Sequence, residues 1–342
     1  MSLEAEVRGA PCILPSYRDL LNRADGQPFG SAWGIFGSAD ELGLVNLIDE
    51  AAVLRGRSAI RSGKVHNLEL RLDAFRPALL PMRAPVIHTV LAPSPYERDD
   101  KLDNLFLQSS TQIDGLRHIS HWEHGFYNGI QPESIQDSSG PLGIHRWSEH
   151  GIITRGILLD LPAWYAHANV EYDPSSPHPI TADDLRSASE WQGVTFEPGD
   201  ALLVRTGWLS YALSAAPEVR AQWHVRFTNP GLDQSEAMAD WLWDSHVALV
   251  ASDNATVERY PPLHGSPFVS SDEAERRNRS YLTGMIHRIW IPLLGMALGK
   301  LWDLDGLASA CTADGVWEFM LSAKPLNVEG GVGSPASAVA IR

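Results

Sequence analysis

The sequence predicts a mixed α/β protein of 342 residues. Short apolar runs that end in a polar residue alternate with segments that begin on a helix-capping residue, a pattern typical of buried strands connected through helices. No internal repeat or low-complexity tract interrupts the pattern, and no Gly or Pro cluster divides the chain into halves. We therefore expect one domain over residues 1–342, long enough to bury a sizeable core.

The chain up to residue 206 contains one predicted helix and three predicted strands. The helix, Asp49 to Ser62, opens on an acidic N-cap. Val65 to Leu72 follows as a strand. Gly156 to Leu161 and Ala201 to Thr206 are apolar runs of strand length, and we expect both to be buried.

The second half adds two helices and two strands. Asp233 to Ser245 and Asp303 to Asp314 are the helices, and the second begins on Asp and stops before Gly315. Val247 to Ser252 and Trp317 to Ser322 have the strand pattern.

Polar residues at the ends of these strands are candidate site positions, because buried strands present functional groups from the loops that follow them. They are Asp160, Arg205, Thr206 and Asp253. The alternative for Asp160 and Asp253 is that each caps a turn or a following helix.

Composition excludes several classes of protein. The net charge of −15 argues against a nucleic-acid partner, and no run approaches the roughly 20 apolar residues of a membrane span. The N-terminus has no apolar core of signal-peptide length, and Cys12 and Cys311 form no CxxC pair. We expect a cytoplasmic protein that acts on a small molecule.

The stretch QSSTQIDGLRHISHWEH, from Gln108 to His124, gathers potential metal ligands. Asp114 and His118 share a face if it is helical, whereas Gln112 and Asp114 share a face if it is a strand, and Gly115 marks a change between the two. Metal sites use neutral His, carboxylate or thiolate ligands, and one Asp among scattered His is a moderate signal.

Other catalytic patterns are missing. The sequence has no GxSxG, P-loop, HExxH or post-strand GxGxxG motif, which leaves serine hydrolysis and phosphate or dinucleotide binding without support. The glycine-rich piece from Gly330 to Pro335 is expected to form a tight turn packed against a neighbour. Most of the twelve Trp residues are expected in the core, and Trp33 lies near polar clusters as a candidate cavity residue.

Six ordered blocks of the chain resemble the "putative cyclase" superfamily, which includes bacterial kynurenine formamidase and isatin hydrolase. The blocks are GSAWGIFGSADELGLVNLI, QSSTQIDGLRH with FYNGI, LGIHRWSEHGIITRGILLDLP, FEPGDALLVRTGW, ASDNATVERYP and PLNVEGGVGSPASAVAI. The resemblance implies a swivelling-domain-like α/β fold with a central β-structure flanked by helices. It also implies a homo-oligomer, commonly a dimer, and makes residues 1–62 an N-terminal extension packed on the domain.

The chain departs from the family at the metal ligands. Family hydrolases carry HxGTHxDxPxH, in which the first two His and the Asp hold Mn or Zn. Here Gln108 and Gln112 replace those His, while Asp114 and the last His, His118, remain. His287 also remains, but Lys300 stands where the family has a late Glu, and an ammonium repels a dication.

The resemblance therefore implies a metal-free acid–base site in this branch. We expect His118, oriented by Asp114, to be the general base, with Lys300 and His287 as further catalytic residues. The residues expected to bind substrate are Gln108, Gln112, Trp33, His121, Tyr127, Asn128, Asp253 and Glu258. The alternatives are that both glutamines only satisfy buried backbone groups and that Lys300 is a solvated surface residue.

The leading hypothesis is an enzyme that hydrolyses a small lactone, lactam or amide without a bound cofactor. Three alternatives stay open. One is an Mn- or Zn-dependent amidohydrolase, the second a cyclase, dehydratase or isomerase that removes a proton next to a carbonyl, and the third a small-molecule binding protein without activity.

Overall fold

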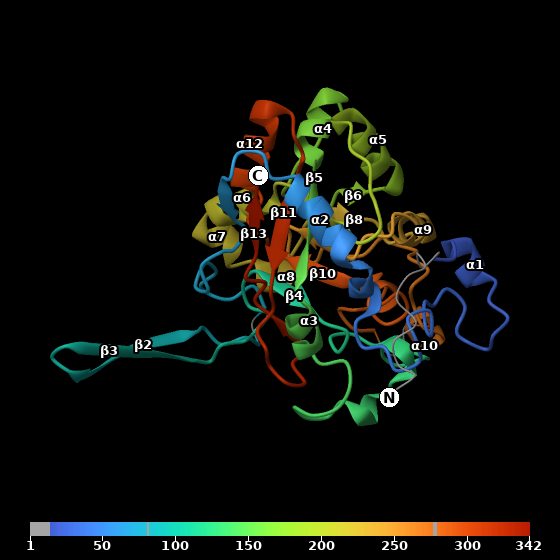
Figure 1. Ribbon diagram of the computed structural model, residues 1–342, viewed down its shortest axis with the longest axis horizontal. Helices are drawn as coiled ribbons and strands as arrows, with labels where there is room; N and C mark the ends of the chain where they lie inside the picture. Colours follow the sequence, from blue (N-terminus) through green and yellow to red (C-terminus); the bar gives the residue numbers. More distant parts are fainter. Residues whose placement is uncertain (1–13, 81, 276–278) are drawn as a thin grey trace, which may run out of the picture.

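The protein is built on one nine-stranded sheet that curls through its centre, with helices around it (Figure 1). The computed structural model describes residues 14–80, 82–275 and 279–342. Cys12 and the N-terminal stretch without a signal-peptide core lie outside the described residues. The mixed α/β architecture predicted from the sequence is confirmed.

The strand order in the central sheet is β1-β13-β11-β5-β7-β9-β10-β4-β12. The strands of this sheet are β1 Val65–Asn67, β4 Gln112–Asp114, β5 Ile152–Asp160, β7 Ala201–Arg205, β9 Leu249–Ser252, β10 Ala297–Lys300, β11 Glu318–Ala323, β12 Gly333–Ser334 and β13 Val339–Ile341. Two small ribbons stand outside it and consist of β2 Ile87–Ser94 with β3 Glu97–Asp103, and β6 Pro179–Ile180 with β8 Gly231–Leu232.

The helices are mostly short. They are α1 Tyr17–Leu21, α2 Glu50–Ser58, α3 His145–His150, α4 Leu161–His167, α5 Ala182–Gln192, α6 Trp208–Ser214, α7 Pro217–Arg220, α8 Trp223–Arg226, α9 Glu236–Asp244, α10 Ser271–Ala274, α11 His287–Trp290 and α12 Asp305–Asp314, with 3-10 turns at Gly43–Leu47, Tyr127–Gly129 and Pro132–Ser134. Within the described residues, none of them combines the length and the apolar character that crossing a bilayer requires.

Parallel strands form the middle of the sheet. β5, β7, β9 and β10 pair in parallel, while β11, β13 and β1 on one side and β4 and β12 on the other pair antiparallel. The side chains of β7 through Val204 and all those of β9 and β10 are buried, as the apolar runs predict for strands covered on both faces. Helix α2 packs across β5 and β11 (Figure 1).

All predicted helices and strands form, with shifted boundaries. Asp49 caps α2 by accepting from the Ala52 amide, as its acidic position predicts, although the helix ends at Ser58. Strand β5 begins four residues before its predicted start. Strand β1 ends at Asn67, well before Leu72.

One short strand that positions the site was not predicted as an element. Residues 112–114 form the short strand β4, and the chain then runs through turns, so Asp114 and His118 are not on one helix. Gly115 begins those turns, and a side chain there would meet the Val332 carbonyl at 2.8 Å. Near the C-terminus, Gly330 (φ +62°) packs against the Ser138 carbonyl, as the glycine-rich piece predicts.

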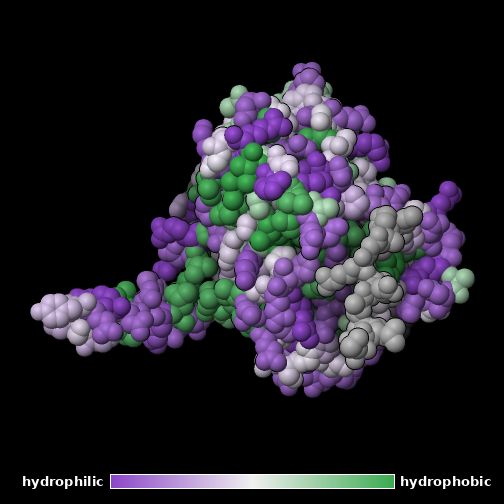
Figure 2. Space-filling view, viewed as in Figure 1, coloured by the Kyte–Doolittle hydropathy of each residue, from purple (hydrophilic) through white to green (hydrophobic). Residues whose placement is uncertain are grey.

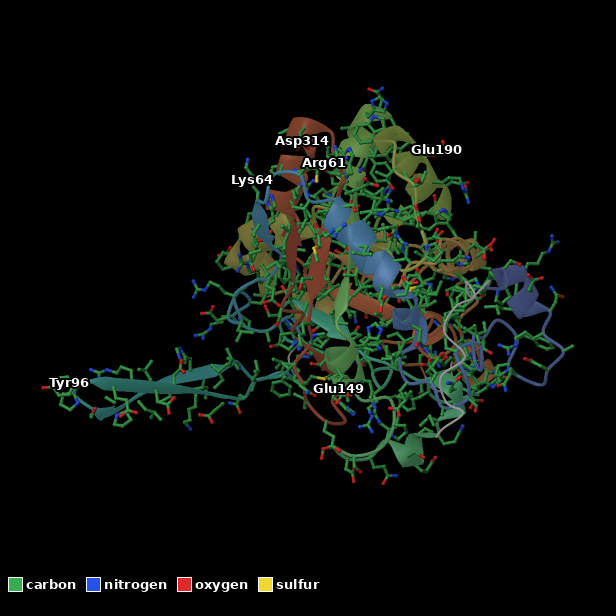
Figure 3. All side chains as sticks on the ribbon, in the orientation of Figure 1. Arg61, Lys64, Tyr96, Glu149, Glu190 and Asp314 are labelled. Atoms are coloured by element: carbon green, nitrogen blue, oxygen red, sulfur yellow. The ribbon has the colours of Figure 1, made fainter. Side chains whose placement is uncertain are left out.

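The ribbon of β2 and β3, which we call the arm, projects away from the body (Figure 1). Tyr96 lies at its tip (Figure 3) and is fully exposed. The arm's side chains are exposed along most of both strands. The sequence pattern of this segment is strongly polar in β3, which explains why it was not recognised as a strand.

Candidate active site

The site begins with the antiparallel pairing of β4 and β10. Lys300 lies opposite Gln112 and Leu298 opposite Asp114, so the side chains of Gln112, Asp114 and Lys300 share one face of the sheet. Lys300 Nζ reaches diagonally to within 2.6 Å of Asp114 Oδ2. Lys300 is only 7% exposed, so the alternative that it is a solvated surface residue is wrong.

Asp114 is a buried carboxylate held in its charged form. Burial alone favours the neutral acid, but His118 and Lys300 together lower its pKa well below the usual range. The amide nitrogen of Gln108 donates to the other oxygen, Asp114 Oδ1. One oxygen therefore accepts a hydrogen bond, and the other contacts the Lys300 ammonium in an ion pair.

Gln108 also fixes the proton of His118. Its Nε2 lies 3.1 Å from His118 Nδ1, and because an amide nitrogen can only donate, we assign Nδ1 as the acceptor. The proton of the neutral ring then sits on Nε2, 3.7 Å from Asp114 Oδ2. Burial lowers the pKa of His118 to about 4, so the ring is neutral at pH 7.

His287 has the opposite arrangement, because its Nδ1 contacts Glu258. Both residues are fully buried, and the Glu258 carboxylate also accepts from the backbone amides of Ile286 and His287 at 3.0 and 3.1 Å and from Gln234 at 2.7 Å. A carboxylate surrounded by donors can only accept, so we assign the His287 proton to Nδ1. Burial and the charge of Lys300 lower the pKa of His287, which leaves a neutral ring with a lone pair on Nε2.

That lone pair has no hydrogen-bond partner among the described residues, and neither has Gln112 Oε1. His287 Nε2 lies 3.9 Å from Asp114 Oδ2, which has the ion pair with Lys300 but likewise no hydrogen bond among the described residues. Buried polar atoms in native proteins are nearly always paired, so two orphaned atoms in one place indicate a position that a ligand or water fills.

Both orphaned side chains line a cavity of about 240 Å³. Its polar lining includes Gln108, Gln112, His118, His287 and Lys300. Apolar side chains form most of the remaining wall: Leu79, Leu80, Ile119, Trp223, Phe227, Tyr260, Leu282, Met285 and Leu301. A small apolar cavity with a few convergent polar groups is the usual form of a small-molecule site.

The structure brings Gln108, Gln112, His118, His287 and Lys300 to the cavity wall and holds Asp114 and Glu258 directly behind it. The aromatic wall was missed by sequence reasoning. Trp223 and Phe227 belong to a segment without any motif, and only the fold places it beside the strand pair.

Trp33, Tyr127 and Asn128 do not line this cavity. Trp33 donates from its ring nitrogen to the Pro292 carbonyl, and the Tyr127 hydroxyl donates to Asp40. Asn128 donates to the carbonyls of Gly37 and Asp40. The polar groups of Tyr127 and Asn128 therefore hold the loop of residues 34–40 in place.

His121 and Asp253 also lie outside the cavity lining. His121 stacks on Trp122 at 3.8 Å between ring centroids. Asp253 uses both carboxylate oxygens on Thr206 and Gly207, 2.7 to 2.8 Å away. Asp160 accepts from the Ala163 amide at the start of α4, so the capping alternative holds for it.

The donor set does not fit a divalent metal. An ammonium and an amide N–H contact the two oxygens of Asp114, which are the oxygens a cation would need. Within the described ranges no group of three or more His, Cys, Asp or Glu side chains is arranged to hold a metal ion.

A family model described as "Putative cyclase" matches residues 71–259, more than half of the chain. The chain belongs to this cyclase family. The match begins before the arm and runs past Glu258, so it includes Asp114 and His118 but ends before His287 and Lys300. Family membership confirms the resemblance seen in the sequence and indicates that this cyclase-family chain is an enzyme.

Solved structures support the same fold. A crystal structure of a novel cyclase is 28% identical, with a TM-score of 0.77 over 91% of this chain and 99% of that one. Isatin hydrolase A from Labrenzia aggregata, bound to benzyl benzoate, is 14% identical, with a TM-score of 0.55 over 83% of this chain and 94% of that one. Isatin hydrolase A from Ralstonia solanacearum is 19% identical, with a TM-score of 0.54 over 85% of this chain and 94% of that one. No curated protein matches the chain.

Proposed function

We propose that this cyclase-family enzyme hydrolyses a small cyclic ester or amide by general acid–base catalysis without a metal ion. The observation that carries the proposal is the orphaned lone pair of His287 Nε2, which faces the cavity beside Lys300. The isatin hydrolases of similar fold are named for the hydrolysis of a cyclic amide, which supports the reaction class.

His287 is the general base in this proposal. Its Nε2 takes a proton from a water molecule, whose oxygen attacks the substrate carbonyl carbon, while Glu258 stabilises the resulting imidazolium through Nδ1. Sequence reasoning placed His118 first for this role. Its Nδ1 is already occupied by Gln108, so the contacts favour His287.

Lys300 stabilises the negative charge that develops on the carbonyl oxygen. An ammonium has three N–H donors, and Asp114 is the one partner of Nζ found in the described residues. As the tetrahedral intermediate collapses, the carbon–nitrogen or carbon–oxygen bond breaks. The leaving atom takes a proton from the His287 imidazolium, which returns that ring to its neutral form and completes the proton balance.

We expect turnover of some member of a panel of lactones, lactams and cyclic imides, with no loss after exhaustive chelation. Elemental analysis of the same purified protein should show substoichiometric Mn and Zn. Hydrolysis in H₂¹⁸O should place one ¹⁸O atom in the product acid. Stoichiometric metal with chelator-sensitive turnover contradicts the metal-free mechanism, and product without ¹⁸O identifies a cyclase or isomerase instead.

We also propose that the protein is a homo-oligomer, in which the arm packs on a second copy. A two-stranded ribbon has little stability alone, and Ile87, Val90, Leu91 and Leu102 on this arm are exposed apolar residues. Figure 2 shows further apolar residues gathered where the arm leaves the body. Burying them against another copy explains why they are apolar.

Light scattering after gel filtration should give at least twice the chain mass for the parent protein. Replacing residues 88–102 by an Asn-Gly turn should give a monomer. A milder variant, Val90→Lys with Leu91→Lys, should weaken assembly and leaves the body unchanged. A monomeric parent protein, or variants that assemble normally, contradicts the proposal.

A cytoplasmic location is likewise our proposal. Its support is Cys311, a free thiol that is fully buried in the core, which suits a reducing compartment.

A further inference from the structure

Arg83 is a cation in the cavity wall that has no hydrogen-bond or ion-pair partner among the described residues. Its side chain is half-buried, and no hydrogen bond or ion pair of its guanidinium is found in the described residues. The other buried or half-buried arginines of the described chain all donate to carbonyls or carboxylates: Arg23, Arg55, Arg117, Arg155, Arg205, Arg220, Arg259, Arg288 and Arg342. Arg83 therefore has unused binding capacity.

The charges around the cavity do not balance Arg83. Of the residues that the structure describes, no Asp or Glu lines the cavity, although the chain as a whole carries a net charge of −15. Lys300 is already paired with Asp114 at 2.6 Å. Burial lowers the pKa of Arg83, and the charges of Asp114 and Tyr281 offset this effect only in part.

An unpaired guanidinium in a half-buried site is stabilised by an anion that accepts hydrogen bonds from its N–H groups. A carboxylate fits this geometry with two parallel hydrogen bonds. Part of the wall is aromatic, with Phe227 between Trp223 and Tyr260 at ring-centroid distances of 6.4 and 5.8 Å. Such a wall suits a flat ring.

We propose that the substrate is a ring compound bearing a carboxylate, and that Arg83 binds this carboxylate while the scissile carbonyl lies beside Lys300 and His287. This inference rests on the proposed function, because both use one cavity. Arg83 determines specificity and takes no part in proton transfer. The chain therefore selects anionic substrates through a residue outside the six sequence blocks that mark the family.

The test uses two unreactive probes of similar shape, 2-naphthoate and the neutral 2-acetylnaphthalene, in calorimetric titrations. The parent protein should bind the carboxylate at least about tenfold more tightly, the usual strength of a charge-assisted pair. Arg83→Met should bind both probes within about threefold of each other. Arg83→Lys keeps the positive charge but loses the pair of parallel N–H donors. It should retain a reduced preference for the carboxylate probe.

Arg76→Met is the matched control, because Arg76 lines a neighbouring pocket and not this cavity. It should keep the full preference. Arg83→Met should melt at or above the parent temperature, since it removes an unpaired charge. Equal affinity of the parent protein for both probes overturns the proposal, and so does a preference that survives in Arg83→Met but disappears in Lys300→Met.

The probes contain no scissile ester or amide, so their binding is independent of turnover. A chain that prefers 2-naphthoate but hydrolyses no panel compound contradicts the proposed function alone. A chain that hydrolyses neutral lactones and shows no Arg83-dependent preference contradicts this inference alone.

Discussion

His287→Ala is expected to lower kcat by about 10²- to 10⁴-fold, the range typical for removal of a general base. His287 Nε2 is the orphaned lone pair at the cavity, and Glu258 holds the ring in the tautomer that exposes it. Steady-state kinetics on whichever panel substrate turns over will measure the effect. KM should change little, because the ring acts on water and not on the bound substrate.

The pH profile separates this base from a structural histidine. The base works only when neutral, and burial lowers the pKa of His287 below the ordinary histidine value of about 6.5. The value of kcat/KM should therefore stay level down to about pH 6.5 and fall only at lower pH. Glu258→Gln removes the charge that raises the basicity of His287. The fall of kcat/KM on the acid side should therefore move to lower pH, and the loss of rate should be smaller than in His287→Ala.

His121→Ala is the matched control, since His121 is a buried histidine outside the cavity lining. It should stay within about twofold of the parent rate if the protein folds. If His118→Ala abolishes turnover while His287→Ala leaves it nearly intact, the base is His118, as sequence reasoning first placed it.

Lys300→Met is expected to cost about 3 to 5 kcal/mol of unfolding free energy, because it leaves Asp114 charged and buried without its counter-ion. Asp114 is fully buried and Lys300 lies 2.6 Å away. Urea unfolding of parent and variant at pH 7 measures the difference. Turnover should also fall, since the oxyanion loses its positive charge.

The stability difference between the parent protein and Lys300→Met should depend on pH. In the parent protein the pKa of Asp114 is lowered, so its stabilising contribution is present above the unfolded value of about 3.9 and disappears as the pH falls through the folded value. Without Lys300 the folded pKa rises, and protonation at low pH relieves the penalty. The stability gap between the two proteins should narrow as the pH approaches 4.

Asp114→Asn in the Lys300→Met background should restore most of the lost stability, because the buried charge is then gone. This double variant distinguishes an unpaired charge from lost packing of the lysine stem. A double variant as unstable as Lys300→Met contradicts the ion-pair explanation.

Much of the fold could be predicted from local patterns. The apolar runs of β5, β7 and β9 and the Asp49 cap of α2 depend on near neighbours in sequence, and these elements form as predicted. Strand β4 has only three residues, which is too short for a periodic signal, and the arm's β3 is almost wholly polar. Both therefore escaped sequence reasoning.

The sequence by itself determined which chemical groups the candidate site contains: two amides, two carboxylates, two histidines and a lysine. Only the tertiary structure decided how these groups meet. The register of β4 against β10 directs Lys300 at Asp114, and Gln108 and Glu258 set opposite tautomers on His118 and His287. Hydrogen bonds between residues far apart in the chain depend on how the chain folds in space, which no local pattern encodes. The same holds for Arg83, because its lack of a partner among the described residues is seen only in the folded structure.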